Sequence, residues 1–244
     1  MSFGYGFGVA CRTSKAVSTF DPATLALTGW WRGSYDGSGT WSGTASAGSS
    51  GTRSLVELTN KPSSGTAVNG FNPATFDGVN DKLGGAAVST YMTVAAYAGW
   101  ALVNVSSIST NSAAPALYDN VTIWSNGAFG GLVLRSTGTV TLFHFDGSQQ
   151  EVAASFSTAT WQLVQWKYDG TNLKVRVNGG ARSSTAAGSL SDLTSTFYLS
   201  NRYDGTADLP ADVLEVGLID SALSDANEDN VLSYARSRYA LALT

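Results

Sequence analysis

Alternating apolar and polar side chains constrain the fold of this chain more than any other feature. The clearest example runs from 161 to 180, where the segment 173–177 reads LKVRV. It follows the turn sequence YDGTN at 168–172 and precedes NGG at 178–180. Alternation with a period of two residues indicates a half-buried strand, and Asn and Gly accept the positive φ that a tight hairpin requires. The segment therefore predicts two antiparallel strands and the start of a third.

Short strand-like segments recur along most of the chain, separated by Gly, Asn, Asp and Ser. Several short strands with closely spaced turn signals indicate a β-sandwich or a β-barrel. Further predicted strands cover 74–76, 100–106, 121–124, 131–135, 140–145, 196–200 and 213–219. In the last of these, Leu214, Val216 and Leu218 form the purer apolar face, which we expect to point inward. The region 33–51 is rich in Gly, Ser and Thr and is predicted to be a long surface loop that Tyr35 and Trp41 hold down.

The end of the chain has helical rather than strand spacing. Ser224 suits a helix N-cap, and the acidic residues that follow it favour the positive end of the helix dipole. The prediction is a C-terminal helix over 224–241. No shift in composition marks a domain boundary, so we predict one domain over 21–244, preceded by 1–20 as an N-terminal arm or a first strand.

Composition excludes several classes of protein. The 244 residues include 14 Lys or Arg and 18 Asp or Glu, a charged share of 13% with a net charge of −4. A chain with so few cations and no basic stripe is not expected to bind nucleic acid. The single cysteine, Cys11, and the single histidine, His144, exclude an intrachain disulfide and a zinc site of Cys or His clusters. No apolar run reaches the ~18 residues that span a bilayer, and the N-terminus has no basic signal-peptide region, so we expect synthesis in a cytoplasm without membrane insertion.

Several motifs occur in an order that resembles a known family. DPATL at 21–25 precedes Trp30 and Trp31, FDGVND follows at 76–81, and the hairpin at 161–180 precedes LIDSALSDA at 218–226. Together they resemble the laminin-G-like, concanavalin A-like jelly-roll domains of bacteria and their phages, over nearly the whole chain from about Asp21. The resemblance implies an all-β fold, an antiparallel β-sandwich of the concanavalin A-like jelly-roll type with a short C-terminal helix.

The N-terminal sequence MSFGYGFG and the Ser, Thr, Gly and Ala texture look like phage and prophage versions of this family. That resemblance implies a virion accessory protein of a tailed phage, which decorates the capsid or serves in the tail or in adhesion. Its expected partners are other virion proteins, further copies of itself and host-surface glycans, and its expected location is the virion, assembled in the host cytoplasm. The alternatives are a stand-alone carbohydrate-binding lectin module and a glycoside hydrolase of the same fold.

The hydrolase alternative requires two well-placed carboxyl groups. The laminarinase-like branch of the fold carries them as Glu-x-Asp-x-Glu on one strand. None of the four glutamates, at 57, 151, 215 and 228, begins that pattern; Glu215 is followed by Gly217 and Ile219. His144 lies between Phe143 and Phe145 on a predicted strand and is expected to be satisfied or solvated rather than catalytic. We therefore expect no catalytic residues and no enzyme activity.

Aromatic residues beside amides and acids near turns have the chemistry of a sugar site. The candidate glycan contacts are Trp124, Asn126, Asn201, Arg202, Tyr203 and Asp204. The alternative for both segments, 124–127 and 201–205, is an ordinary turn. Trp30, Trp31 and Trp41 are further candidates for stacking on sugar rings, whereas Trp100, Trp161 and Trp166 lie in strand patterns and are predicted to belong to the core.

Calcium is the only cofactor that the sequence suggests, because its ligands are carboxylate and amide oxygens. The candidate ligands are Asp77, Asn80, Asp81, Asp204 and Asp208, with Asp212 close to the last two. The alternative is that these residues only form turns.

The N-terminal arm carries the candidate partner-binding residues Phe3, Tyr5 and Phe7, which alternate with glycine. Such an arm could pair with the sheet edge of a neighbour, and the alternative is a first strand of the domain. Low charge on strand edges favours self-association, which is why we expect a homo-oligomer.

Overall fold

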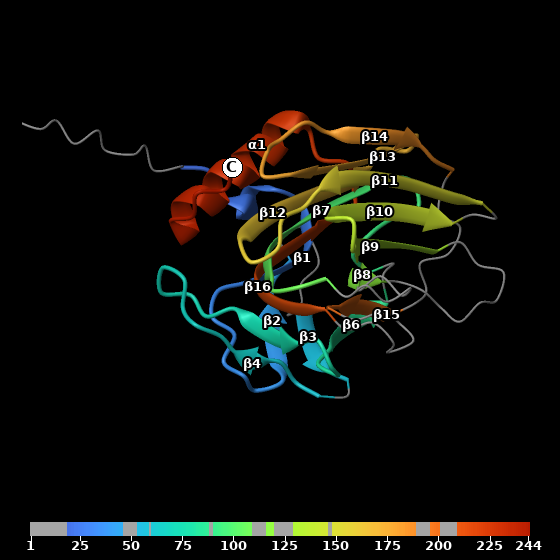
Figure 1. The fold of residues 1–244 in the computed structure, drawn as a ribbon. Coiled ribbons are helices and arrows are strands. Elements are labelled where there is room, and N and C mark those ends of the chain that lie inside the picture. The colour runs from blue at the N-terminus through green and yellow to red at the C-terminus, as the bar shows by residue number, and fades with distance from the viewer. Residues whose placement is uncertain are drawn as a thin grey trace, which may run out of the picture.

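The protein is an antiparallel β-sandwich with one C-terminal α-helix, as the sequence predicts (Figure 1). The computed structural model describes residues 19–45, 53–58, 60–87, 90–108, 116–119, 129–145, 148–188, 196–200 and 209–244. A short 3₁₀ turn, Pro22–Thr24, precedes the first strand. The described part of the chain contains no helix that is long and apolar enough to cross a membrane.

The first sheet contains eight strands, all paired antiparallel. In spatial order it runs β14 (Ser183–Ala186), β13 (Asn172–Val177), β12 (Trp161–Tyr168), β7 (Tyr97–Val105), β16 (Pro210–Ile219), β5 (Ala74–Asp77) and β4 (Ser63–Ser64). The eighth strand, β1 (Leu27–Arg32), also pairs with β16. Because β7 occupies one edge of β16, β5 and β1 share the other edge, one after the other.

The second sheet also contains eight antiparallel strands. Its order is β11 (Gln149–Ser155), β10 (Thr139–Phe145), β9 (Phe129–Arg135), β8 (Ala116–Asp119), β15 (Thr196–Leu199), β6 (Leu83–Ala87), β3 (Arg53–Glu57) and β2 (Thr40–Gly43). Inward side chains of the two sheets form the main core, which includes Trp31, Trp166 and Phe197. The rings of Trp31 and Phe197 stack with centroids 5.9 Å apart. Aromatic rings of this size contribute a large share of the buried apolar area.

A second core lies on the outer face of the first sheet, beneath helix α1 (Asp225–Tyr239). Trp30 and Trp100 project from the sheet into this layer, where they meet Val231 and Tyr239 of the helix. Figure 1 shows α1, in red, lying over the strands of the first sheet. Because both faces of the central strands are buried, β7 is apolar almost throughout rather than alternating. In β12 even the polar residues Gln162, Gln165 and Lys167 are buried.

Strand β16 departs from the predicted alternation. Its pairing with β7 shifts between Val213 and Glu215, so one extra residue is inserted there. Val216 and Leu218 point into the main core as predicted, but Leu214 lies in the second core beneath the helix. The prediction for Leu214 was wrong because the bulge interrupts the alternation. Residues on either side of the bulge that are an even number of positions apart face opposite sides of the sheet.

The other predicted elements are confirmed except in two places. The hairpin at 161–180 forms β12 and β13, and Asn178 and Gly179 adopt positive φ of 52° and 76° at the turn that follows. The predicted loop at 33–51 contains the strand β2, although Tyr35 and Trp41 are buried within it as expected. The predicted strand at 121–124 lies outside the described residues.

Helix α1 and the residues after it are bound to the first sheet. Ser224 caps the helix as predicted, since its Oγ accepts a hydrogen bond from the Asn227 N–H at 3.2 Å. Beyond the helix, Leu243 is buried, and the Asn178 side chain donates to the carbonyl of Thr244 at 2.9 Å. The C-terminal residues are therefore part of the packed structure.

Candidate functional site

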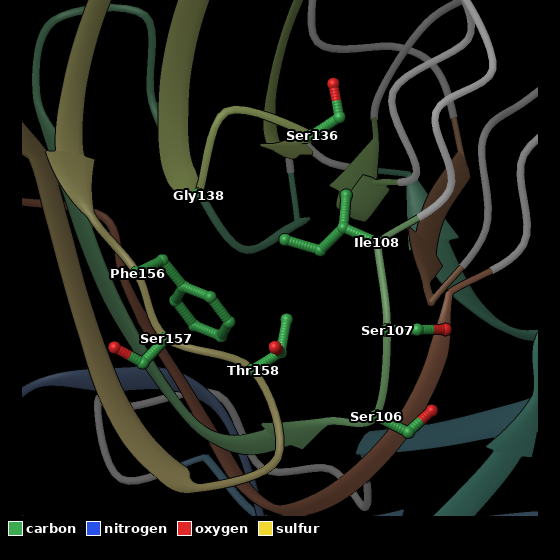
Figure 2. A pocket seen from close by; sticks show the side chains of 8 residues that line it. All are labelled: Ser106, Ser107, Ile108, Ser136, Gly138, Phe156, Ser157 and Thr158. Carbon is green, nitrogen blue, oxygen red and sulfur yellow. The ribbon is translucent and has the colours of Figure 1, made fainter.

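Three loops border a shallow, open hollow with a volume of about 530 Å³ (Figure 2). They are the residues after β7, the turn between β9 and β10, and the connection from β11 to β12. The lining residues are Ser106, Ser107, Ile108, Ser136, Gly138, Phe156, Ser157 and Thr158. All eight are hydroxyl-bearing, apolar or glycine, so the hollow combines hydroxyl groups with an apolar surface.

Backbone hydrogen bonds tie the three loops to one another. Gly138 adopts a positive φ of 76° and donates to the carbonyl of Arg135 at 3.0 Å, which closes the β9–β10 turn. The Phe156 N–H then donates to the carbonyl of Gly138 at 2.8 Å, and the Ala159 N–H donates to the carbonyl of Val105 at 2.7 Å. These bonds fix the walls of the hollow before any ligand arrives, which lowers the entropic cost of binding.

The apolar part of the hollow consists of Phe156 and Ile108. Phe156 is only 5% exposed and belongs to the main core, and Ile108 packs against that core. Figure 2 shows the two side chains extending toward each other from opposite walls. They give the hollow an apolar inner surface that does not depend on a mobile side chain.

The hydroxyl groups lie around this apolar surface. Ser106 Oγ donates to the carbonyl of Pro210 at 3.3 Å. Ser107, Ser136, Ser157 and Thr158 are exposed, and their hydroxyls form no hydrogen bond with another residue in the part of the chain that the structure describes. Each hydroxyl can both donate and accept. An apolar face surrounded by such groups matches the surface of a sugar ring, which has apolar C–H faces and equatorial hydroxyls.

None of the described lining residues carries a titratable side chain. The described glutamates have other roles, and Glu215 is one of two that are fully buried. Its carboxylate accepts hydrogen bonds from the indole N–H groups of Trp30 (2.8 Å) and Trp100 (3.1 Å) and from the hydroxyls of Tyr234 (3.3 Å) and Tyr239 (2.6 Å). Burial raises the pKa of Glu215, and the hydrogen bonds and Arg238 only partly offset that effect. Glu215 joins the sheet to the helix and does not face the hollow.

The remaining glutamates also lie away from the lining. Glu228 is buried beneath the start of α1, where Lys167, Arg176 and Arg182 surround it. Glu151 forms an ion pair with Arg135 on the second sheet, and Glu57 is exposed on β3. The hollow therefore has no carboxyl group among its described residues that could act as a general acid, base or nucleophile.

The first predicted calcium cluster forms a hydrogen-bonded turn at the end of β5. Asp77 Oδ1 accepts from the N–H groups of Val79 (2.8 Å) and Asn80 (3.2 Å), and these bonds hold the pKa of Asp77 below its usual value. Asp81 Oδ2 accepts from the N–H of Asp77 at 3.0 Å, and burial raises the pKa of Asp81. The geometry is that of the turn alternative, and calcium binding here stays a prediction.

The second predicted calcium cluster is only partly described. Asp204 and Asp208 lie outside the described residues, and Asp212 Oδ1 accepts from Thr75 Oγ1 at 2.5 Å. Within the described ranges, no group of three or more His, Cys, Asp or Glu residues is placed to hold a metal ion.

The other predicted site residues divide into two groups. The candidate glycan contacts and the N-terminal arm lie outside the described residues: Trp124, Asn126, Asn201, Arg202, Tyr203, Asp204, Phe3, Tyr5 and Phe7. The stacking role suggested for Trp30, Trp31 and Trp41 was wrong, because all three side chains are buried in the two cores. Trp100 and Trp166 are buried as predicted. His144 is also fully buried, with its Nε2 atom 2.5 Å from the Tyr97 hydroxyl, which indicates a structural role.

None of the site residues predicted from the sequence belongs to the described lining of the hollow. The segments SSIS at 106–109 and FSTAT at 156–160 are rich in hydroxyl groups and follow directly on strands. That signal was present, but the same composition is typical of ordinary turns. Nothing local in the sequence shows that the two segments meet.

Comparisons with solved structures place the chain among β-sandwich domains. It is similar to a Trypanosoma rangeli sialidase in complex with the inhibitor DANA, with a TM-score of 0.62 and 13% identity over 89% of this chain. The chain spans only 35% of that sialidase. It is also similar to the binding domain of botulinum neurotoxin DC in complex with SialylT, with a TM-score of 0.64 and 12% identity, covering 86% of this chain and 51% of that one.

A third similar structure corresponds to a single domain. It is domain 4 of AbnA, an extracellular arabinanase from Geobacillus stearothermophilus, in complex with arabinotriose. The TM-score is 0.56 at 13% identity, covering 73% of this chain and 81% of that domain. At these identities the likeness concerns the fold. No protein-family model matches the sequence, and no curated protein matches it either.

Proposed function

We propose that this protein is a non-catalytic, glycan-binding β-sandwich and that it serves as an accessory protein of a tailed-phage virion. The observation that carries the glycan-binding part is the hollow of about 530 Å³, in which exposed hydroxyls surround Phe156 and Ile108. A sugar is recognised by contact of its apolar face and by directional hydrogen bonds to its hydroxyls. The hollow offers both on loops that backbone hydrogen bonds already hold in place.

The structural neighbours support this proposal at the level of the fold. The arabinanase domain was solved with arabinotriose, and the botulinum neurotoxin domain with SialylT. The arabinanase domain, of which this chain covers 81%, thus shares the fold and was solved with a sugar oligomer. Function still depends on the site rather than on the fold, so the hollow and not the likeness has to be tested.

The hydrolase alternative draws its support from the sialidase neighbours. Cleavage of a glycosidic bond requires two carboxyl groups, or an equivalent nucleophile and acid, beside the scissile bond. The described lining of the hollow has no such group, and the buried Glu215 and Glu228 are occupied by sheet-to-helix contacts. We therefore propose binding without cleavage.

A glycan array with the purified chain tests the binding proposal, followed by titration calorimetry with the best ligand. Thr158→Trp places an indole in the hollow and should weaken binding at least tenfold. The matched control is Ser184→Trp, which changes an exposed hydroxyl residue on β14, on the strand that pairs with β13. Wild-type binding that T158W abolishes and S184W retains supports the proposal. No binding to any glycan, or equal loss in both variants, contradicts it.

The virion role, the partners and the location are proposed from the sequence resemblance. Mass spectrometry of purified particles tests them, because an accessory protein is expected as a stoichiometric component of the particle. Light scattering after size-exclusion chromatography tests the proposed homo-oligomer. A chain that binds glycans but is absent from particles would instead be the stand-alone lectin module.

A further inference from the structure

We infer that the hollow takes uncharged glycans and discriminates against glycans that carry a carboxylate or a sulfate. This inference rests on the proposed function and adds to it the chemical class of the ligand. It follows from the distribution of cations along the sequence and from the position of Arg135, the one Lys or Arg in the stretch of sequence that supplies the described lining.

The part of the chain that builds the hollow contains almost no cations. All eight lining residues lie between Leu83 and Trp166, and this whole stretch contains one Lys or Arg, namely Arg135. The other 13 of the 14 cationic residues lie before or after it. A positive charge from this stretch can therefore reach a ligand in the hollow only through Arg135.

Arg135 directly precedes the lining residue Ser136, but its side chain is engaged elsewhere. Its Nη2 atom forms an ion pair with Glu151 Oε1. Arg135 lies opposite Thr139 in the register of β9 and β10, whereas Glu151 lies opposite Phe143, four residues farther along β10 from the turn. The ion pair thus draws the guanidinium along the sheet, away from the β9–β10 turn and the hollow.

The consequence for a ligand follows from desolvation. An anionic group that loses water must gain a compensating cation or several strong donors, and Arg is the usual partner of carboxylates and sulfates. A ligand in this hollow meets neutral hydroxyls, and the protein carries a net charge of −4. An uncharged sugar has no such requirement, because hydroxyl-to-hydroxyl bonds replace its bonds to water.

The test compares matched pairs of glycans on one array and by calorimetry. The probes are lactose with 3′-sialyllactose, and N-acetyllactosamine with its 6-sulfated form, together with neutral arabinotriose. For each pair in which either glycan binds, we expect the dissociation constant of the neutral glycan to be at least tenfold lower than that of its charged derivative. The dissociation constant of the neutral glycan should also stay constant within about twofold between about 50 and 500 mM NaCl, because no charge pair is formed.

A charge-gain variant provides the positive test. Ser136→Lys introduces a cation at the exposed rim, and Ser107→Lys does the same from another loop if the first variant does not fold. Because either variant also removes a lining hydroxyl, the readout is the ratio of charged to neutral affinity within a pair, which should rise at least tenfold over the wild type. The matched control is Ser184→Lys on β14, which should change neither member.

The outcomes separate the two proposals. Charged glycans that bind as tightly as neutral ones, with binding lost in T158W, would overturn the inference and leave the proposed function standing. Absence of binding by every glycan would overturn the proposed function itself. Binding that T158W leaves unchanged would place the site away from the hollow and overturn both the site and its selectivity.

Discussion

Glu215 shows how much a single side chain can determine in this fold. It lies on β16, and its four hydrogen-bond donors come from β1, β7 and α1. The two indole N–H groups can only donate, so they have no partner in the second core without this carboxyl group. Burial raises the pKa of Glu215 in the folded state above its ordinary value of 4.5. A raised carboxyl pKa means that the folded protein binds the proton more tightly than the unfolded chain does.

The first prediction concerns the pH dependence of Glu215→Gln. The stabilisation from the raised pKa is fully present below about pH 4.5 and is lost as the pH rises through the folded value. The wild type should therefore lose stability relative to E215Q as the pH rises. We expect E215Q to be less stable by about 1 kcal/mol at acidic pH, with a gap that narrows or reverses toward pH 8. Urea unfolding at several pH values measures this gap.

Glu57→Gln is the control for that experiment. Glu57 is exposed on β3, so its replacement should change stability by less than about 0.5 kcal/mol at every pH. A gap between wild type and E215Q that widens with rising pH would show that the hydrogen bonds and Arg238 outweigh burial.

At the scale of elements, the helix is attached to the sheet by buried charges as well as by apolar packing. Lys167 on β12 is 4% exposed, and its Nζ donates to the carbonyl of Leu223 and to Asp225 Oδ1, both at 2.8 Å. The same ammonium lies 3.4 Å from the buried carboxylate of Glu228. Removing one partner of a buried ion pair leaves the other charge uncompensated, which costs more than the pair itself contributed.

We therefore expect Lys167→Met to destabilise the protein by about 3 kcal/mol. The neighbouring cations Arg176 and Arg182 also contact Glu228 and limit the loss. Lys174→Met is the matched control, since Lys174 pairs with Lys167 in the strand register but bonds an exposed turn, and it should cost about 1 kcal/mol or less. Equal effects of the two variants in urea unfolding would contradict a buried role for Lys167.

The turn between β12 and β13 gives a third prediction. Burial of Asp169 by itself raises its pKa, but hydrogen bonds from Lys174 and from the N–H groups of Asn172 and Thr171 outweigh it and lower the pKa to about 2. The resulting stabilisation is present above the usual pKa of 3.8 and is lost as the pH falls toward about 2. We expect Asp169→Ala to cost about 2 kcal/mol at neutral pH and much less near pH 2.

Asp169→Asn separates the two contributions at this turn. The amide oxygen can still accept from the backbone N–H groups, whereas the ion pair with Lys174 is lost. It should therefore cost about half as much as D169A at neutral pH. A D169A penalty that does not change with pH would contradict the lowered pKa.

Local patterns predicted most of the elements but did not predict the hollow. The hairpin of β12 and β13 has its alternation, its turn residues and its glycine within 20 consecutive residues, so the sequence contains all that is needed to predict it. The bulge at Leu214 and the short strand β2 depend on pairing with distant segments, and no local pattern marks them. The hollow joins loops that begin at Ser106, Ser136 and Phe156, and only the folded register brings them together.

At the scale of the whole molecule, charge is separated from the candidate site. Lys and Arg are concentrated outside 83–166, and four of them, Lys167, Lys174, Arg176 and Arg182, form ion pairs beneath α1 or at the β12–β13 turn. The hollow differs from these regions, because its described lining contains no titratable side chain. Recognition there relies on shape and neutral hydrogen bonds.

The fourth prediction follows from this separation. Glycan affinity should vary by less than about twofold between about pH 5 and pH 8, because no group in the described lining changes its charge in that range. Calorimetric titration of the best array ligand at several pH values checks it. A dissociation constant that changes tenfold would indicate a titrating group in the site and would favour the hydrolase alternative.

The bond between Asn178 and the carbonyl of Thr244 has a practical consequence for all of these experiments. A purification tag or biotin acceptor peptide attached after Thr244 would leave the domain from a residue held against the β13–β14 turn, and Leu243 would have to stay buried beside it. Immobilisation for array or sensor work is better made through the N-terminal end, which leaves the packing of α1 and Leu243 on the first sheet undisturbed.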